Sequence, residues 1–348
     1  MIEKFACKNL TTFDRINIAF SPGINVIIGE NGTGKTHLLK AAYALAGAGA
    51  IKGSGTAFEV AFTEELVRLF LPLEGRLLAL RKWGESGKAV VAADFSAGRR
   101  LSAVFGDDAE YLSVMDDNFP RHYTDTPVFI PTRESLSFLH GFDALYERFD
   151  LPFDSTFRNL SLLLGTPALR AEKVEPSVRR MMEAIEKICG GRFAFGSGGV
   201  VVFASGDERY SANASAEGFL QFGVLYRLLE NGSIRPGESG PLFWDLPETS
   251  LNPKLLKVLA WMLLELARNG QQVVLATHSY VLMKYLDLLR DSPKGDAVRY
   301  HSLHRDEGGI VKLETVDNYN HLSANSIAET YLNLYDTEVE RAFGRKRG

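Results

Sequence analysis

Hydrophobic and polar residues alternate along the first third of the chain, and a period of two is typical of strands with one buried face. The pattern predicts short strands over residues 2–28 with a turn at Asp14-Arg15. Four later segments alternate in the same way between breaks of Gly, Ser and Asp, which predicts an antiparallel sheet. These segments are 57–62, 77–82, 89–95 and 101–105, and a short strand closed by prolines follows at 126–131.

The period changes to that of amphipathic helices over residues 135–189 and returns to strands over 190–210. Helices and apolar strands then alternate, which predicts a parallel sheet covered by helices. The expected elements are helices at 215–230, 251–269, 279–290 and from about 323, and strands at 241–245, 271–276 and 297–314. The predicted fold class is α/β, with a parallel core sheet, an antiparallel β subdomain and an inserted helical segment.

The composition is that of an ordinary globular protein, with 348 residues of which 45% are hydrophobic and 24% charged. The net charge of −4 indicates no broad basic surface, so charge gives no support for nucleic-acid binding, which stays open. Cys7 and Cys189 are too few for a disulfide framework and are expected to be reduced, buried thiols. Neither a signal-peptide core nor an apolar run of about eighteen residues is present, which predicts a cytoplasmic protein outside the membrane.

The most informative segment, residues 29–36, reads GENGTGKT and fits the phosphate-binding loop pattern G-x-x-x-x-G-K-[ST]. A β-branched strand leads into it and a helix at 36–46 leads out, as the motif requires. Its glycines let successive backbone N–H groups face one anion, and the helix start adds its positive dipole end. The agreement of motif and flanks disfavours the alternative, a glycine-rich turn with a surface lysine. The expected nucleotide-binding residues are Gly29, Asn31, Gly32, Thr33, Gly34, Lys35, Thr36 and His37.

Two side chains of this loop have distinct expected roles. Lys35 is placed to reach the β- and γ-phosphates of a nucleoside triphosphate, and the Thr36 hydroxyl to ligate Mg²⁺. The apolar strand 241–245 ends in Asp245, a carboxylate suited to stabilise the same Mg²⁺. Asp245 could instead cap the helix that begins near residue 251, but it lies too far upstream for that. The separation of Asp245 from Lys35 is much longer than in compact GTPases and is typical of ABC-type and SMC-type ATPases.

Three further segments resemble parts of ABC-type ATPases. His278, at the end of the strand in QQVVLATHSY, resembles the switch histidine that contacts the γ-phosphate; taken alone, it could be a helix-start or core histidine. Ser215 and Gly218 open an apolar helix and resemble a degenerate signature motif, whose Ser and Gly bind the γ-phosphate of the opposite protomer. An ordinary helix cap is the alternative for Ser215. Residues 249–253 (TSLNP) fall where the dimer-facing D-loop follows the aspartate strand.

In the order of these motifs the chain resembles the OLD-like and SMC-like ABC ATPases, a group that includes RecF-like repair proteins. The resemblance covers about residues 1–50 and 205–290. It implies an ATPase that uses ATP and Mg²⁺, with an N-terminal ATPase lobe at 1–134, a helical insertion at 135–200 and a C-terminal ATPase lobe at 201–348. It also implies a homodimer that sandwiches two ATP molecules.

Two positions depart from the family pattern. Residues 129–134 (FIPTRE) lie where these ATPases carry the Q-loop, but Arg133 and Glu134 stand there instead of glutamine. The family's aspartate is followed at once by a glutamate that positions the attacking water, whereas Asp245 is followed by Leu246. Leucine cannot polarise water or accept a proton.

Glu248 is a candidate replacement for the missing glutamate, although Pro247 stiffens the loop that carries it. The catalytic residues expected from the resemblance are Lys35, Asp245, Glu248 and His278. Losing the water-positioning group costs about a hundredfold or more in rate, so we expect slow or conditional hydrolysis.

Two functions stay open. The first is an ATP-driven switch in DNA repair or anti-phage defence that acts with a separate effector, a setting that the resemblance alone carries. The second is a nucleotide-gated scaffold or sensor that does not hydrolyse ATP. A transporter subunit is disfavoured because a tight LSGGQ-like signature and a clear Q-loop are missing, and the lack of an NKxD motif favours ATP over GTP.

The residues after His278 contain no compact DxD motif, so the Toprim nuclease domain of OLD-family proteins is not visible. His301, His304 and Asp306 could form a metal site, but their spacing puts the two histidines on opposite faces of a strand. The basic residues within 341–347 are expected to form a solvated tail.

Overall fold

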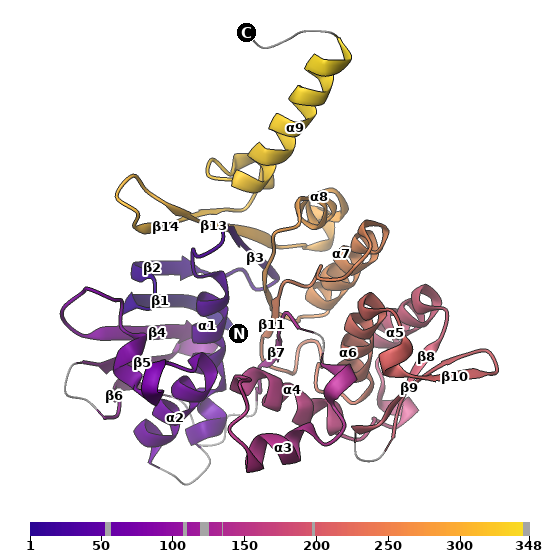
Figure 1. The fold of residues 1–348 in the computed structure, drawn as a ribbon, viewed down its shortest axis with the longest axis horizontal. Helices are drawn as coiled ribbons and strands as arrows, with labels where there is room; N and C mark the ends of the chain where they lie inside the picture. The colour runs from indigo at the N-terminus through magenta and orange to yellow at the C-terminus, as the bar shows by residue number, and fades with distance from the viewer. Residues whose placement is uncertain (53–56, 107–109, 119–124, 134, 197–198, 344–348) are drawn as a thin grey trace.

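The computed structural model describes residues 1–52, 57–106, 110–118, 125–133, 135–196 and 199–343. Within these residues, the centre is a sheet whose strands run parallel except for the edge strand β14 (Figure 1). The strand order is β14 (Val311–Val316), β13 (Val298–Arg305), β3 (Ile24–Gly29), β12 (Val273–Ala276), β11 (Leu242–Asp245) and β7 (Val128–Ile130). The three strands β3, β12 and β11 are buried throughout, so each reads as a continuous apolar run. The predicted parallel core sheet is confirmed.

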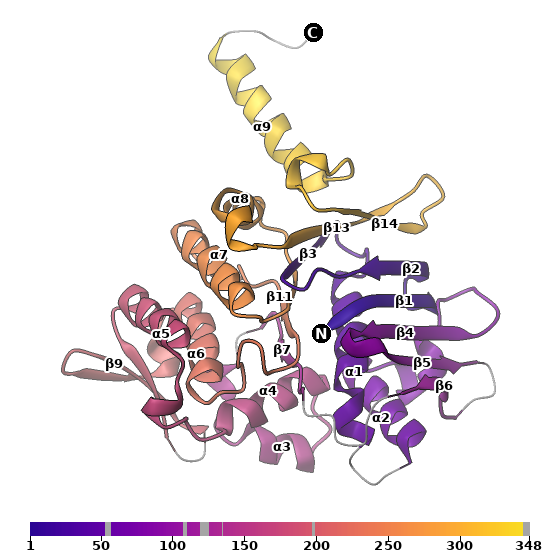
Figure 2. The ribbon, with the colours of Figure 1, turned by 180° about the vertical axis from the view of Figure 1, so that it is seen from behind.

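A second, antiparallel sheet lies beside the first (Figures 1 and 2). Its strand order is β2 (Phe13–Ala19), β1 (Ile2–Leu10), β4 (Ala89–Phe95), β5 (Arg99–Phe105) and β6 (Ser113–Asp117). The helix α1 (Lys35–Lys52) belongs to a core shared by both sheets, because Leu38 packs in one cluster with Phe5 of β1 and Val274 of β12. The strands predicted at 89–95 and 101–105 are confirmed.

Helices and a small antiparallel sheet cover the other side of the parallel sheet. These elements are α3 (Phe142–Arg148), α4 (Ser155–Gly165), α5 (Pro176–Cys189), β8 (Arg192–Phe195), β9 (Val201–Ser205), β10 (Glu208–Ser211), α6 (Glu217–Glu230), α7 (Pro253–Arg268) and α8 (Tyr280–Leu289). Of these elements, α4, α5, β8, β9, α6, α7 and α8 bury apolar residues in a second core with Trp244 of β11. The helical period predicted over 135–189 and the strands predicted over 190–210 are confirmed. The last helix, α9 (Ser326–Ala342), projects away from the body (Figure 2).

Two of the strands predicted in the N-terminal part are wrong. Residues 57–62 belong to the helix α2 (Phe58–Phe70), which buries Phe62, Leu66 and Leu69 at helical spacing. Residues 77–82 contain a 3₁₀ turn at Leu77–Leu80. A short apolar run does not distinguish a strand from a buried helix, and the residues that follow decide.

Two turns also differ from the predictions. The chain turns at Thr11, with φ +49°, and Asp14 lies inside β2, so the predicted turn at Asp14-Arg15 is wrong. Arg15 instead pairs with Lys8 across the ladder. The strand predicted over 297–314 is a hairpin of β13 and β14.

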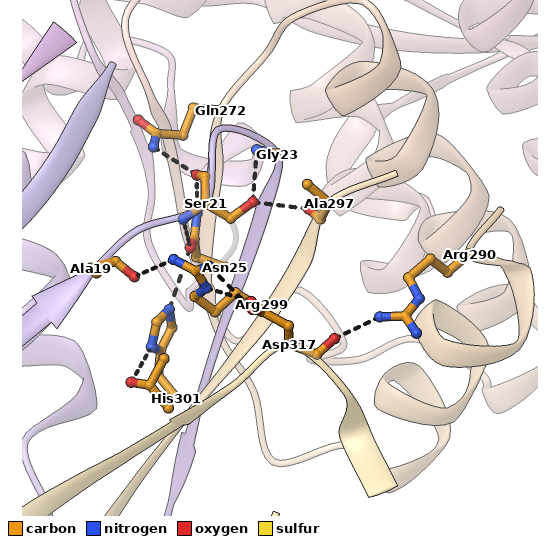
Figure 3. A network of polar contacts seen from close by, with 11 residues as sticks. Ala19, Ser21, Gly23, Asn25, Gln272, Arg290, Ala297, Arg299, His301 and Asp317 are labelled. Atoms are coloured by element: carbon orange, nitrogen blue, oxygen red, sulfur yellow. Dashed lines mark hydrogen bonds and ion pairs between the residues drawn. The ribbon is translucent and has the colours of Figure 1, made fainter. Parts of the chain in front are cut away.

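Buried polar side chains join the two sheets at the amino ends of the core strands (Figure 3). The Gln272 amide accepts the N–H of Ile2 at 2.8 Å and donates to the carbonyl oxygens of Ile2 at 2.8 Å and Ser21 at 2.9 Å. Asn25 accepts the N–H of Ser21 at 2.7 Å and donates back to its carbonyl at 2.9 Å. Each bond satisfies a buried polar group, so the network fixes how the sheets meet. His301 belongs to this network through Asn25.

No helix in the described ranges is long and apolar enough to cross a membrane. Cys7 and Cys189 are buried free thiols, as predicted, and burial raises the pKa of each to about 12. The region boundaries at 134 and 200 stay a prediction. Glu134 and residues 345–347 lie outside the described residues.

Candidate nucleotide-binding site

The loop at 29–36 joins the carboxyl end of β3 to the start of α1, in the middle of the parallel sheet. Its geometry requires two of its glycines. Gly29 has φ +147°, and a Cβ there would lie 2.2 Å from the carbonyl oxygen of Leu303. Gly34 has φ +94°, and a Cβ there would lie 2.5 Å from Cγ2 of Thr12. The loop backbone therefore approaches its neighbours more closely than a residue with a side chain would allow.

Lys35 begins α1 and is buried, with its ammonium group folded back over the loop. Nζ donates to the carbonyl oxygens of Gly29 and Glu30, each at 2.9 Å. Burial lowers the pKa of Lys35, while the carboxylates of Asp245 and Glu248 oppose that shift. A positive charge fixed beside the loop suits the β- and γ-phosphates of a nucleotide.

The Thr36 hydroxyl donates to Oδ2 of Asp245 at 2.8 Å. Asp245 is buried at the carboxyl end of β11, and only β12 separates β11 from β3, so the strand order brings the two side chains together. A hydroxyl and a carboxylate are hard oxygen donors of the kind that bind Mg²⁺ beside substrate phosphates. The two residues predicted to bind metal thus lie in contact, and they fit Mg²⁺.

His278 follows β12 on the short loop before α8, where Ser279 caps the helix by accepting the N–H of Leu282 at 3.1 Å. Burial lowers the pKa of His278, and the charge of Lys35 lowers it further, so the imidazole is neutral near pH 7. His278 and the loop enclose a cavity of about 310 Å³. The cavity is lined by Thr12, Asn31, Gly32, Gly34, Lys35, Thr36, His37, Asp245, Leu246 and His278.

Leu246 lines this cavity at the position where the resemblance places a glutamate. Its φ of +52° is left-handed and unfavourable by roughly 1 kcal/mol or more for a residue with a side chain. The described residues that line the cavity do not include Glu248. Its Oε1 instead accepts the backbone N–H of His278 at 2.7 Å, and burial raises the pKa of Glu248.

The signature-like residues lie at the start of α6 and do not line the cavity formed by the described residues. The N-cap of α6 is Ala216, so the alternative that Ser215 caps the helix is wrong. The Ser215 hydroxyl is buried without a hydrogen-bond partner among the described residues. Gly218 packs against the 249–253 segment of its own chain, since a Cβ there would lie 2.7 Å from the carbonyl oxygen of Ser250. A contact of this pair with a second protomer stays a prediction.

Comparisons with known proteins match both halves of the site. The family description "AAA domain" matches residues 4–76, and "AAA domain, putative AbiEii toxin, Type IV TA system" matches residues 141–284. The fold is similar to a crystal structure of an Smc head bound to the C-winged helix domain of ScpA, with a TM-score of 0.58 at 15% identity over 92% of this chain and 98% of that chain. The chain is thus similar to ABC/SMC-like AAA ATPases in both family matches and in fold.

A second Smc head has a fold similar to that of this chain. It carries an extended coiled coil and is bound to the C-terminal domain of ScpA derived from Pyrococcus furiosus. The TM-score is 0.54 at 14% identity, over 97% of this chain and 98% of that chain. At this identity the likeness concerns the fold.

The chain is also similar in sequence to proteins named DNA replication and repair protein RecF. That of Ligilactobacillus salivarius is 47% identical over 45 residues, which is 13% of this chain and 12% of the relative. That of Mannheimia succiniciproducens is 27% identical over 143 residues, which is 40% of this chain and 35% of the relative. The chain thus spans between 12% and 35% of the length of these relatives, and the match relates it to DNA repair proteins through the shared part.

A second cavity, of about 350 Å³, shares Thr36 and Asp245 with the first. Arg133 also lines it and follows β7, where the resemblance places the Q-loop. The structure therefore puts an arginine near the pair that fits Mg²⁺, and its role there stays a prediction.

Two residues that shape the loop were not predicted from the sequence. Nη2 of Arg305, at the end of β13, donates to the carbonyl oxygen of Gly32 at 2.8 Å. The residues DEGG at 306–309 are the signal for this contact, because a turn there ends β13 beside the loop. Thr12 lines the cavity from the turn between β1 and β2, and no local pattern marks it.

Proposed function

We propose that this chain binds Mg-ATP at the loop and works as a nucleotide-driven switch. The observation that carries the proposal is the contact between Thr36 and Asp245 beside the buried ammonium group of Lys35. Two oxygen donors for Mg²⁺ and a cation at a phosphate-binding loop are what a nucleoside triphosphate requires. When bound, Mg²⁺ would neutralise charge on the phosphates, with Thr36 and Asp245 holding it.

The ATP-bound form is proposed to be a homodimer in which two chains enclose two ATP molecules. Ser215 and Gly218 of each chain would contact the γ-phosphate bound by the other chain. The Ser215 hydroxyl has no partner among the described residues of its own chain, which supports this role. ATP would then be part of the interface, so dimerisation depends on the concentrations of nucleotide and protein.

Hydrolysis is proposed to be slow. Leu246 occupies the position of the water-positioning glutamate, and the lost group is worth about a hundredfold or more in rate. The neutral imidazole of His278 faces the same cavity and can hydrogen-bond a γ-phosphate or water. Loss of the γ-phosphate would remove the contact with the second chain, so slow hydrolysis would give a long-lived switch.

The setting is proposed to be DNA repair or anti-phage defence in the cytoplasm, with a separate effector protein. Support comes from the RecF relatives and from a matching family whose description includes a putative toxin of a Type IV system. The two Smc heads of similar fold are each bound to a domain of ScpA. Proteins of similar fold thus bind a separate partner protein, which supports a separate effector for this chain.

Phosphate release from Mg-ATP, measured over a range of protein concentrations, tests the proposed function. We expect turnover that rises more than linearly with protein concentration and disappears in Lys35→Ala. Turnover that is strictly linear would contradict the dimeric site. Turnover that persists in Lys35→Ala would place hydrolysis elsewhere.

The position of Leu246 favours a second candidate function, a nucleotide-gated scaffold that binds ATP without hydrolysing it. Leu246→Glu distinguishes the two functions, because it restores a carboxylate to the cavity wall. A slow ATPase should turn over at least about tenfold faster after this change. A scaffold should bind ATP and dimerise but release no phosphate in the wild-type protein.

A further inference from the structure

We infer that Glu248 is a positioning residue that holds the loop of His278 in place, an inference that rests on the proposed function. Its carboxylate Oε1 accepts the backbone N–H of His278 at 2.7 Å. The hydroxyl of Thr277 and the N–H of Ser279 also stabilise the charged form of this carboxylate. One hydroxyl and two backbone N–H groups, from three consecutive residues, therefore stabilise the Glu248 carboxylate.

The turn that carries Glu248 is closed by its own hydrogen bonds. The N–H and the hydroxyl of Thr249 both donate to the carbonyl oxygen of Leu246, at 3.1 Å and 2.9 Å. The N–H of Leu251 donates to the carbonyl oxygen of Glu248 at 3.0 Å, and Pro247 fixes one backbone angle. The carboxylate is thus presented to His278 from a rigid support.

The same turn contacts the signature-like helix. The carbonyl oxygen of Ser250 lies where a side chain on Gly218 would be, so α6 rests directly on the turn. Glu248 therefore connects His278, on one side of the turn, to the helix start proposed to meet a second chain. A movement of the His278 loop or of the start of α6 would therefore displace the other through the Glu248 carboxylate and its turn.

This geometry argues against Glu248 as the base that activates water. A general base must reach the proton that it removes, directly or through one water. The described lining of the cavity includes Leu246 and His278 but not Glu248, and Oε1 is already engaged by the His278 N–H. Glu248 acts on the reaction through the position of His278.

Removal of the Glu248 carboxylate should lower kcat and leave KM nearly unchanged. Loss of the carboxylate would let the His278 loop move, and a misplacement of about 1 Å can cost a hundredfold in rate. The loop at 29–36 and the Thr36–Asp245 contact would stay intact, so KM should change little. Glu248→Gln keeps an oxygen that can accept the His278 N–H, so it should retain both the loop position and the turnover.

The experiment compares Glu248→Gln and Glu248→Ala with the wild-type chain, and uses Glu307→Gln on the exposed β13–β14 turn as the matched control. Hydrogen–deuterium exchange of the His278 amide is measured in nucleotide-free protein. Steady-state ATP turnover is measured in the same four proteins. If Glu248→Ala does not fold, as judged by circular dichroism, Glu248→Ser replaces it.

We expect Glu248→Ala to expose the His278 amide to exchange and to lower kcat by about tenfold or more at nearly unchanged KM. Glu248→Gln should keep both the protection and the turnover. Unchanged protection in Glu248→Ala would overturn the inference. So would a protected Glu248→Gln that loses turnover as fully as Glu248→Ala, because Glu248 would then be the base. If no protein hydrolyses ATP, the proposed ATPase fails, and the exchange result alone decides whether Glu248 holds the loop.

Discussion

Replacing His301 by glutamine tests whether the buried polar network holds this histidine in its neutral form. His301 is completely buried, with Nδ1 3.0 Å from the Thr315 hydroxyl and Nε2 3.3 Å from Oδ1 of Asn25 (Figure 3). Oδ1 of Asn25 is an acceptor, because it already accepts the N–H of Ser21. Nε2 must therefore donate, and Nδ1 can accept from Thr315. This pattern fits the neutral imidazole.

The energetic consequence follows from the pKa of His301. Burial lowers it from 6.5 to about 3, the charge of Arg299 adds to the shift, and Asp317 opposes it. Below pH 6.5 the unfolded chain takes up a proton that the native chain does not, so native stability falls with pH by up to about 1.4 kcal/mol per pH unit. Above pH 6.5 the neutral state of His301 costs the native protein no unfolding free energy. Below pH 6.5 the cost grows as the pH falls towards about 3. Between pH 7 and pH 5 the loss is about 2 kcal/mol.

Urea unfolding at pH 7, 6 and 5 measures this loss, with the fluorescence of Trp244, buried in β11, as the signal. Wild type is compared with His301→Gln and with His321→Gln, which changes an exposed histidine. From pH 7 to pH 5, His301→Gln should lose about 2 kcal/mol less unfolding free energy than the other two proteins. An equal loss in all three would show that His301 is not held neutral in the native protein.

Two further predictions concern packing around the site. Gly218→Ala should lower the unfolding free energy by about 1 to 3 kcal/mol, because its Cβ would meet the carbonyl oxygen of Ser250 at 2.7 Å. In urea unfolding, Gly165→Ala is the control, since nothing lies within 4 Å of a Cβ there, and equal losses would contradict the close contact. Lys40 of α1 contacts Asp154, the N-cap of α4, at 2.8 Å with both side chains mostly buried. A double-mutant cycle with Lys40→Met and Asp154→Asn should give a coupling of about 1 kcal/mol, and a value near zero would contradict a working link between these helices.

The main residues of the site are predictable because each one ends an apolar strand. The loop at 29–36 follows one strand, Asp245 ends another, and His278 is the second residue after a third. In a parallel sheet the carboxyl ends meet at one edge, so the sequence pattern places these residues together before any coordinates are known. The Thr36–Asp245 contact is the direct consequence.

The remaining features depend on information that is not local. Residues 57–62 alone fit a strand as well as a helix, and only Leu66 and Leu69 beyond them give the helical spacing. The His301–Asn25 contact depends on the register between β13 and β3, whose strands are far apart in the sequence. The role of Glu248 depends on the direction of a backbone N–H, which residue type does not reveal.

Binding of Mg-ATP by isothermal titration calorimetry, to the wild-type chain and to Lys35→Ala, tests the central claim most directly. We expect saturable binding of one ATP per wild-type chain, and about tenfold to hundredfold weaker binding after loss of the charged hydrogen bonds from Lys35. Equal affinity of the two proteins, or no binding by the wild type, would contradict a nucleotide site at this loop.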